Sequence, residues 1–271
     1  MDQLKAAIET MTRRIVEILE SCSPSIYLYG SVVLDDFKFG WSDIDLLVLT
    51  EREISEIQAR QLVNLRQTML EEHPENRYYR LFEGGMLTRS ACLANKADRV
   101  VYWGTSGERI TTQYALDVFS LCELLDSGVL LYGKDIRNCF SHPSFDALKA
   151  GVQRHYETIR KYAGTSGRSF YTYGWLLDIS RCLYTLRTGK IIAKTAAGEW
   201  ALKEKLCPCE AVLAKALEIR KEPDRYRQDA SVFDDAETIG EDIQRYADVL
   251  ERELKINAGS TLCPDRAGAA K

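Results

Sequence analysis

The sequence predicts a mixed α/β first half followed by an all-helical second half. Short apolar runs at 26–29 and 46–49 are bounded by turn-forming and polar residues, a pattern typical of buried strands. From residue 145 onward, apolar residues recur at helical spacing instead. A chain of 271 residues suits one large or two medium domains. We therefore expect domains at 1–140 and 141–256, and a small, polar, disordered tail at 257–271.

The first domain is expected to begin with an amphipathic helix, because apolar residues repeat on one helical face from Leu4 to Leu19. A strand at 26–29 then ends at Gly30-Ser31. Two helices are expected next, a short one that begins at 32–37 with its positive end toward the Gly30-Ser31 turn, and one at 54–73 that is polar but helical in pattern. The other expected elements are a strand at 46–49, a strand at 78–87 interrupted at Gly84-Gly85, a strand at 99–103, a helix at 114–125 and an apolar run at 129–132.

The second domain is expected to be a helical bundle. Its apolar stripes predict helices near 145–162, 170–186, 211–219 and 239–254. Each helix has one apolar face that only another helix can cover, so packing into a bundle is the natural outcome.

Composition restricts the partners. With 36 basic and 40 acidic residues the net charge is −4, which disfavours an extended nucleic-acid surface and suits a small cationic molecule better. No apolar stretch approaches the ~20 residues of a membrane span. The N-terminus lacks the continuous apolar core of a secretion signal. We expect a cytoplasmic protein that binds neither nucleic acid nor membrane.

The eight cysteines are scattered, several of them within apolar periodic segments. In a reducing compartment they are expected to act as small core residues. Cys207-Pro-Cys209 is the one close pair, and without a second Cys/His pair it indicates a loop between helices rather than a zinc site.

Two acids precede the second apolar run. Strand side chains alternate between faces, so Asp43 and Asp45 point the same way, roughly 6–7 Å apart at ~3.3 Å rise per residue. Like charges held this close disfavour joint ionisation, and a divalent cation removes that cost. Mg²⁺ bound by one or two carboxylates and by phosphates suits the pair. The alternative is a strand end with two solvated acids.

The Gly30-Ser31 turn supplies a second feature of the same site. Glycine lets the backbone approach a ligand closely, and the serine hydroxyl and following N–H groups are suited to phosphate oxygens. The order is therefore strand, phosphate-binding turn, short helix, and a strand entered through Asp-x-Asp.

Sites that transfer phosphate groups commonly hold two metal ions, and two aspartates are few ligands for both. A third carboxylate is therefore expected on a neighbouring strand. Glu83 is the best candidate, since Gly84-Gly85 after it are expected to leave room for a bulky ligand. It would bind the second metal, take a proton, or do both. The alternative is an exposed acid on an edge strand.

The arrangement of Gly30-Ser31 and Asp43-x-Asp45 between apolar strands resembles the nucleotidyltransferase superfamily. The segment TGKIIAKTAAGEWA, Thr188–Ala201, is similar to a helix–loop–helix of the streptomycin/spectinomycin group of aminoglycoside adenylyltransferases. This resemblance implies a polymerase-beta-like mixed-sheet domain followed by a helical bundle. It also implies transfer of AMP from ATP to a hydroxyl of an aminoglycoside-type antibiotic, with antibiotic resistance as the result.

Carried over by position, the resemblance assigns further roles. Ser31 and Ser42 would contact ATP phosphates, and Glu83 falls at the catalytic glutamate. Asp43 and Asp45 would hold Mg²⁺, with two ions expected.

From the helical domain, the resemblance implies that Lys194 reaches the triphosphate, with Lys190 as a helper. Two departures leave the acceptor open. Residues 94–109 lack the family's basic, proline-rich stretch, and 171–173 replace its acidic residue. The alternatives are transfer to another small molecule such as a lincosamide, transfer to a protein as in toxin–antitoxin systems, or a non-catalytic nucleotide-sensing module.

Overall fold

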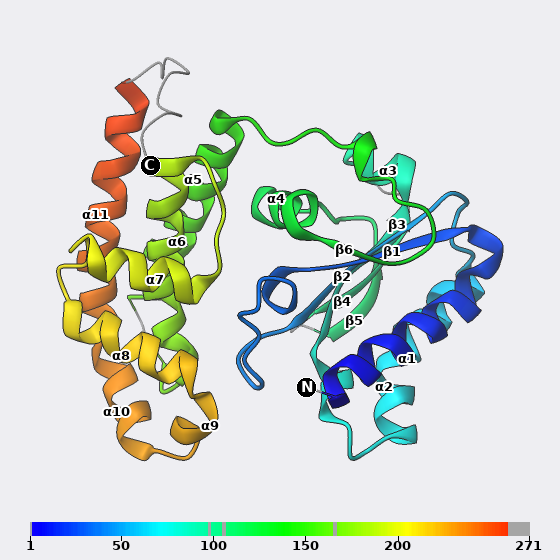
Figure 1. Ribbon diagram of the computed structural model, residues 1–271, viewed down its shortest axis with the longest axis horizontal. Coiled ribbons are helices and arrows are strands. Elements are labelled where there is room, and N and C mark those ends of the chain that lie inside the picture. Colours follow the sequence, from blue (N-terminus) through cyan, green and yellow to red (C-terminus); the bar gives the residue numbers. More distant parts are fainter. Residues whose placement is uncertain (1, 97–98, 105–106, 165–166, 260–271) are drawn as a thin grey trace. The chain divides into compact units, whose positions relative to one another are not determined.

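The computed structural model describes residues 2–96, 99–104, 107–164 and 167–259 (Figure 1). Contacts divide the chain into two units, Met1–Pro143 and Ser144–Lys271. The first unit contains a mixed six-stranded sheet and the second is built from helices, so the predicted fold class is confirmed. The second unit begins at a helix cap, where the Ser144 hydroxyl accepts the backbone N–H of Ala147 at 3.2 Å.

The strands of the first unit form one sheet in the order β5-β4-β3-β2-β1-β6. They span Pro24–Tyr29 (β1), Ile44–Thr50 (β2), Phe82–Thr88 (β3), Val100–Gly104 (β4), Gly107–Thr111 (β5) and Val129–Tyr132 (β6). β2 and β3 run parallel, and the other neighbouring pairs are antiparallel. Apolar spacing does not predict β5, because its sequence GERIT has a single aliphatic side chain.

Helices cover both faces of this sheet. They span Asp2–Leu19 (α1), Glu56–Glu72 (α2), Arg89–Ala94 (α3) and Val118–Ser127 (α4). α1 and α2 pack on the face that carries Ile26 and Leu46, whereas α3 and α4 lie on the face that carries Tyr27 and Leu47 (Figure 1). Because successive strand residues alternate between these layers, the register of the strands decides which side chains share a face.

Three predicted elements of this unit differ in the structure. Instead of a helix at 32–37 there is only a 3₁₀ turn at Gly30–Val32. The strand predicted from residue 78 begins at Phe82, after a 3₁₀ helix at Arg77–Leu81, and continues through both glycines. The helix predicted from residue 114 starts at Val118, because the Asp117 carboxylate caps it by accepting two backbone N–H groups.

The second unit is arranged around a buried helix, α6. Its helices span Phe145–Tyr162 (α5), Gly174–Thr188 (α6), Lys194–Lys203 (α7), Glu210–Lys221 (α8), Pro223–Tyr226 (α9), Ala230–Thr238 (α10) and Gly240–Gly259 (α11). α6 contacts α5, α7, α8 and α11, and its Ser180 hydroxyl lies 3.0 Å from that of Tyr246 on α11. The bundle is as predicted, although residues 170–173 form a 3₁₀ turn that precedes α6.

α11 ends at Gly259, three residues inside the predicted tail, and the remaining residues 260–271 lie outside the described residues. The seven described cysteines are free thiols, and Cys139 is exposed rather than part of a core. No helix among the described residues has the length and apolar character that crossing a membrane requires.

Pairing of β2 with β3 should depend on Gly84. A Cβ atom there would lie 1.8 Å from the Leu46 carbonyl oxygen, at a φ of +143°. We expect Gly84→Ala to lower the free energy of unfolding by more than about 3 kcal/mol, because a backbone clash adds to conformational strain. The matched control is Gly107→Ala, where φ is +93° but the space is open, and we expect a loss of about 1–2 kcal/mol. Urea unfolding followed by circular dichroism measures both, and equal losses would contradict the clash.

Candidate functional site

Two of the three acids predicted to act together, Asp45 and Glu83, lie on one face of the sheet. Tyr29 pairs with Asp45, and Asp45 pairs with Glu83 on the parallel neighbour β3. In each strand these residues alternate with those that face α1 and α2, so their side chains share the α3 and α4 face. Neighbouring strands lie about 4.8 Å apart, so the backbones of Asp45 and Glu83 are adjacent. Asp43, two residues before Asp45, precedes β2.

The turn after β1 brings the backbone against one of these carboxylates. Gly30 has a φ of +70°, and a Cβ atom there would lie 2.2 Å from Asp45 Oδ2. Only glycine therefore allows Asp45 to lie beside the turn. The Ser31 hydroxyl donates to the Asp43 carbonyl at 3.4 Å, and the Ser42 hydroxyl accepts the Lys38 N–H at 3.0 Å. Both serines thus stabilise the loop between β1 and β2.

Glu83 has a partner on the other side. The Tyr102 hydroxyl of β4 donates to Glu83 Oε1 at 3.0 Å. Burial raises the pKa of Tyr102, and the charge of Glu83 and the hydrogen bond to it raise it further. Burial likewise raises the pKa of Tyr29 well above its usual range, with Tyr114 and Asp45 contributing. Asp45 and Glu83 therefore lie near phenols that burial keeps in the neutral form.

A cation beside Asp45 and Glu83 would have oxygen ligands. Among the described residues, no three His, Cys, Asp or Glu side chains converge on one point as a ready metal site. The parallel pairing nevertheless places two carboxylates, those of Asp45 and Glu83, side by side on one face. Mg²⁺ in phosphate-transfer sites is held by one or two carboxylates and completed by phosphates and water, so this donor set fits it. The three-residue ligand set Asp43, Asp45 and Glu83 stays a prediction.

The two glycines after Glu83 do not leave room for a ligand, so that expectation was wrong. A Cβ atom at Gly85 would lie 2.4 Å from the Tyr114 ring, while one at Gly84 would meet Leu46. At both positions another part of the protein occupies the volume that a side chain would fill. The Tyr114 ring lies against Gly85, and the backbone of Leu46 on β2 lies against Gly84.

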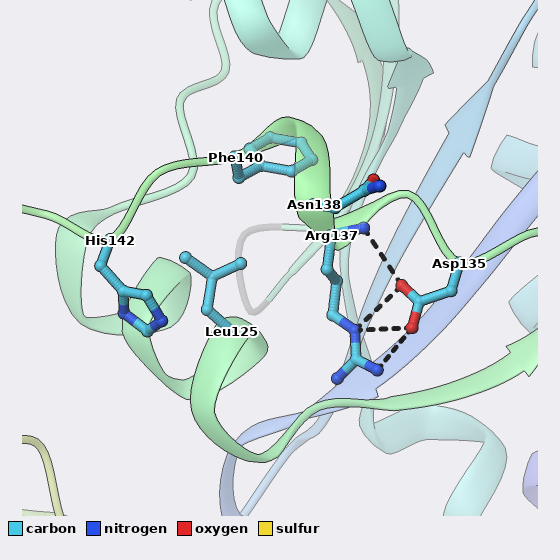
Figure 2. A pocket seen from close by; sticks show the side chains of 6 residues that line it. All are labelled: Leu125, Asp135, Arg137, Asn138, Phe140 and His142. Atoms are coloured by element: carbon cyan, nitrogen blue, oxygen red, sulfur yellow. Dashed lines mark hydrogen bonds and ion pairs between the residues drawn. The ribbon is translucent and has the colours of Figure 1, made fainter.

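A pocket of about 590 Å³ lies at the opposite end of β1 (Figure 2). Its Asp135 accepts a hydrogen bond from the Tyr27 hydroxyl at 3.1 Å and forms an ion pair with Arg137 at 2.6 Å. The Ser25 hydroxyl donates to the Lys134 carbonyl at 2.6 Å, which ties this segment to the start of β1. The six residues of β1 separate this end from Gly30 by about 20 Å at ~3.3 Å per residue. None of the predicted site residues lines the pocket.

The lysines predicted to reach the triphosphate belong to the second unit. Lys194 is the first residue of α7, and its ammonium lies 2.9 Å from Asp178 Oδ1 on α6. Arg181 lies 3.5 Å from the same carboxylate oxygen. Burial opposes ionisation of Asp178, but the charges of Lys194 and Arg181 outweigh it and lower its pKa. Lys190 is exposed in the loop between α6 and α7.

Sequence reasoning missed two partners of the predicted residues, Tyr102 and Asp178. Strand alternation assigns Tyr102 to one face of β4, but only the register with β3 places it beside Glu83. No motif in the sequence indicates Asp178 as the partner of Lys194. The pair joins two helices across a loop, so no short spacing indicates it.

Comparisons with known proteins agree with this architecture. Residues 11–80 match the nucleotidyltransferase domain model, and residues 142–247 match the C-terminal domain of aminoglycoside adenylyltransferases. Among solved structures, the chain is similar to spectinomycin adenyltransferase AAD(9) from Enterococcus faecialis, crystallised with ATP and spectinomycin. The TM-score is 0.68 at 15% identity, and the match covers 91% of this chain and 99% of that chain. The search of curated proteins gives no match.

At this identity the structural likeness supports the fold, whereas the domain models match the sequence itself. Both models match one chain, in the order in which the sheet unit and the helical unit follow each other. The chain therefore belongs to the aminoglycoside adenylyltransferase family of the nucleotidyltransferase superfamily.

Proposed function

We propose that this adenylyltransferase transfers AMP from ATP, with Mg²⁺, to a hydroxyl of a spectinomycin- or streptomycin-like antibiotic and thereby gives resistance. The observation that carries the proposal is the pairing of Asp45 with Glu83 on one face, beside the turn at Gly30. A triphosphate and two carboxylates repel each other unless a cation lies between them. Such a site therefore suits a metal–nucleotide substrate.

In the proposed reaction, the acceptor hydroxyl attacks the α-phosphorus in line with the leaving pyrophosphate. The new oxygen–phosphorus bond forms as the bond to pyrophosphate breaks, and Glu83 takes the hydroxyl proton. Gly30, Ser31 and Ser42 hold the phosphates. Asp43, Asp45 and Glu83 are the proposed Mg²⁺ ligands. When bound, one or two Mg²⁺ ions would supply neutralisation of phosphate charge.

The helical domain is proposed to contribute cations to the nucleotide. Lys194 would bind the triphosphate with help from Lys190, and residues 141–256 would act as the domain that closes on it. Lys194 already has an anionic partner, Asp178, at 2.9 Å, so its ammonium lies in a setting that accepts negative charge. Binding that recruits such a lysine would couple nucleotide binding to assembly of the site.

Two further observations favour a cationic antibiotic as acceptor and ATP as donor. The structurally similar AAD(9) was crystallised with ATP and spectinomycin. The net charge of −4 attracts a cationic acceptor. Dependence on ATP further implies that the enzyme acts in the cytoplasm.

The first prediction concerns turnover. Purified protein with ATP and Mg²⁺ should release pyrophosphate when spectinomycin, streptomycin or a related compound is added, and chelation by EDTA should stop the release. A coupled pyrophosphate assay measures both. No release with any member of a broad aminoglycoside panel would reject the antibiotic as acceptor. Label from [α-³²P]ATP on a protein band in cell lysate would instead indicate a protein acceptor.

The second prediction concerns Asp45. Asp45→Asn keeps the shape of the side chain but removes the charge beside Gly30, so we expect kcat to fall by at least about 100-fold. Asp126→Asn serves as the control, because this side chain of α4 is 58% exposed and lies outside the proposed site. Circular dichroism should give unchanged folding for both. Full activity in Asp45→Asn would overturn the proposed metal ligand.

The third prediction concerns Lys194. Lys194→Ala removes an ammonium that the proposal places on the triphosphate, so the KM for ATP should rise about tenfold, as expected for loss of a hydrogen bond to a charged group. The KM for the antibiotic should change little. Lys203→Ala, an exposed lysine in the last turn of the same helix, is the matched control. A selective rise in the antibiotic KM would contradict the assignment.

A further inference from the structure

The Tyr102 side chain on β4 forms a hydrogen bond with Glu83, the proposed catalytic acid on the neighbouring strand β3. It pairs with Gly85 in the antiparallel register of β4 and β3, so it lies two residues along from Glu83. Its hydroxyl donates to Glu83 Oε1 at 3.0 Å, within normal hydrogen-bond distance.

The ring of Tyr102 is itself held in place. The Arg109 guanidinium of β5 lies 4.4 Å from the ring centre, a cation–π distance, and the Tyr114 ring lies 6.1 Å away. Tyr114 in turn occupies the space above Gly85. The donor to Glu83 is therefore fixed by packing on two sides.

Glu83 needs such a fixed partner. A glutamate side chain has three rotatable bonds, and like charges at Asp43 and Asp45 favour rotamers that point away from them. A hydrogen bond to Oε1 restricts those rotamers and leaves the lone pairs of Oε2 for a cation or a proton. Outer-shell donors of this kind commonly orient the carboxylates that bind metals.

We propose that Tyr102 is a positioning residue that holds the Glu83 carboxylate in the orientation in which it binds the metal ion. The proposal rests on the proposed function, because it requires Glu83 to be a metal ligand. Tyr102 itself touches neither substrate nor metal and acts through Glu83.

Binding of Mn²⁺ to the full-length protein tests this without turnover. Free Mn²⁺ is followed by its EPR signal during titration, with no nucleotide present. We expect Tyr102→Phe, which keeps the ring and the cation–π contact, to raise the Kd for Mn²⁺ about tenfold, as for loss of an outer-shell partner. Tyr114→Phe is the control, since it removes a neighbouring phenol that is not the donor to Glu83. Glu83→Gln reports whether Glu83 binds the metal at all.

The outcomes distinguish the role of Tyr102 from the proposed function on which it rests. Weaker binding in Tyr102→Phe and Glu83→Gln, but not in Tyr114→Phe, supports the proposal. Weaker binding in Glu83→Gln alone overturns the role of Tyr102 and leaves the proposed function intact. Tighter binding in Tyr102→Phe also overturns it, because the hydroxyl would then hold Glu83 away from the metal. Unchanged binding in Glu83→Gln, or no binding in the wild type, overturns both.

Discussion

The parallel pairing of β2 with β3 determines the site. It places Asp45 beside Glu83 on one face, and two carboxylates on adjacent strands repel each other by about 1 kcal/mol in water and by more where water is excluded. Each carboxylate has its own neighbour, the Gly30 turn for Asp45 and the Tyr102 hydroxyl for Glu83. The pairing also needs Gly84, so the residue after Glu83 is constrained by the sheet and not by a ligand.

Side chains of a strand point alternately to the two faces of the sheet, so in the first unit one face packs on helices while the other carries the proposed site. The face that packs on α1 and α2 is lined by apolar side chains such as Ile44, Leu46 and Phe82. The opposite face is apolar at Leu47 and Leu87 and carries acids at Asp45 and Glu83. β2 and β3 thus contribute apolar side chains to the core along most of their length and carry acids at one end. This arrangement requires that a charged ligand can reach that end.

Local sequence predicted the turn after β1 and the acids at the start of β2 better than the residues that surround them. The Gly30-Ser31 turn and the Asp-x-Asp entry to β2 depend on spacings within one short segment, and the fold class follows from periodicities of a similar range. The helix predicted at 32–37 is wrong, because six residues after a glycine turn form successive turns as readily as a helix. The role of Gly84-Gly85 and the partner of Glu83 depend on strand register, which joins residues far apart in the chain.

The ion pair of the second unit adds an independent argument for an anion near Lys194. A lysine at the first position of a helix is unfavourable, because the helix dipole is positive there. Arg181 adds another cation to the same place, 3.5 Å from the same oxygen of Asp178. The charges of Lys194 and Arg181 lower the pKa of Asp178 despite its burial, and a helix N-terminus that already holds one carboxylate is suited to the negative charge of a phosphate as well.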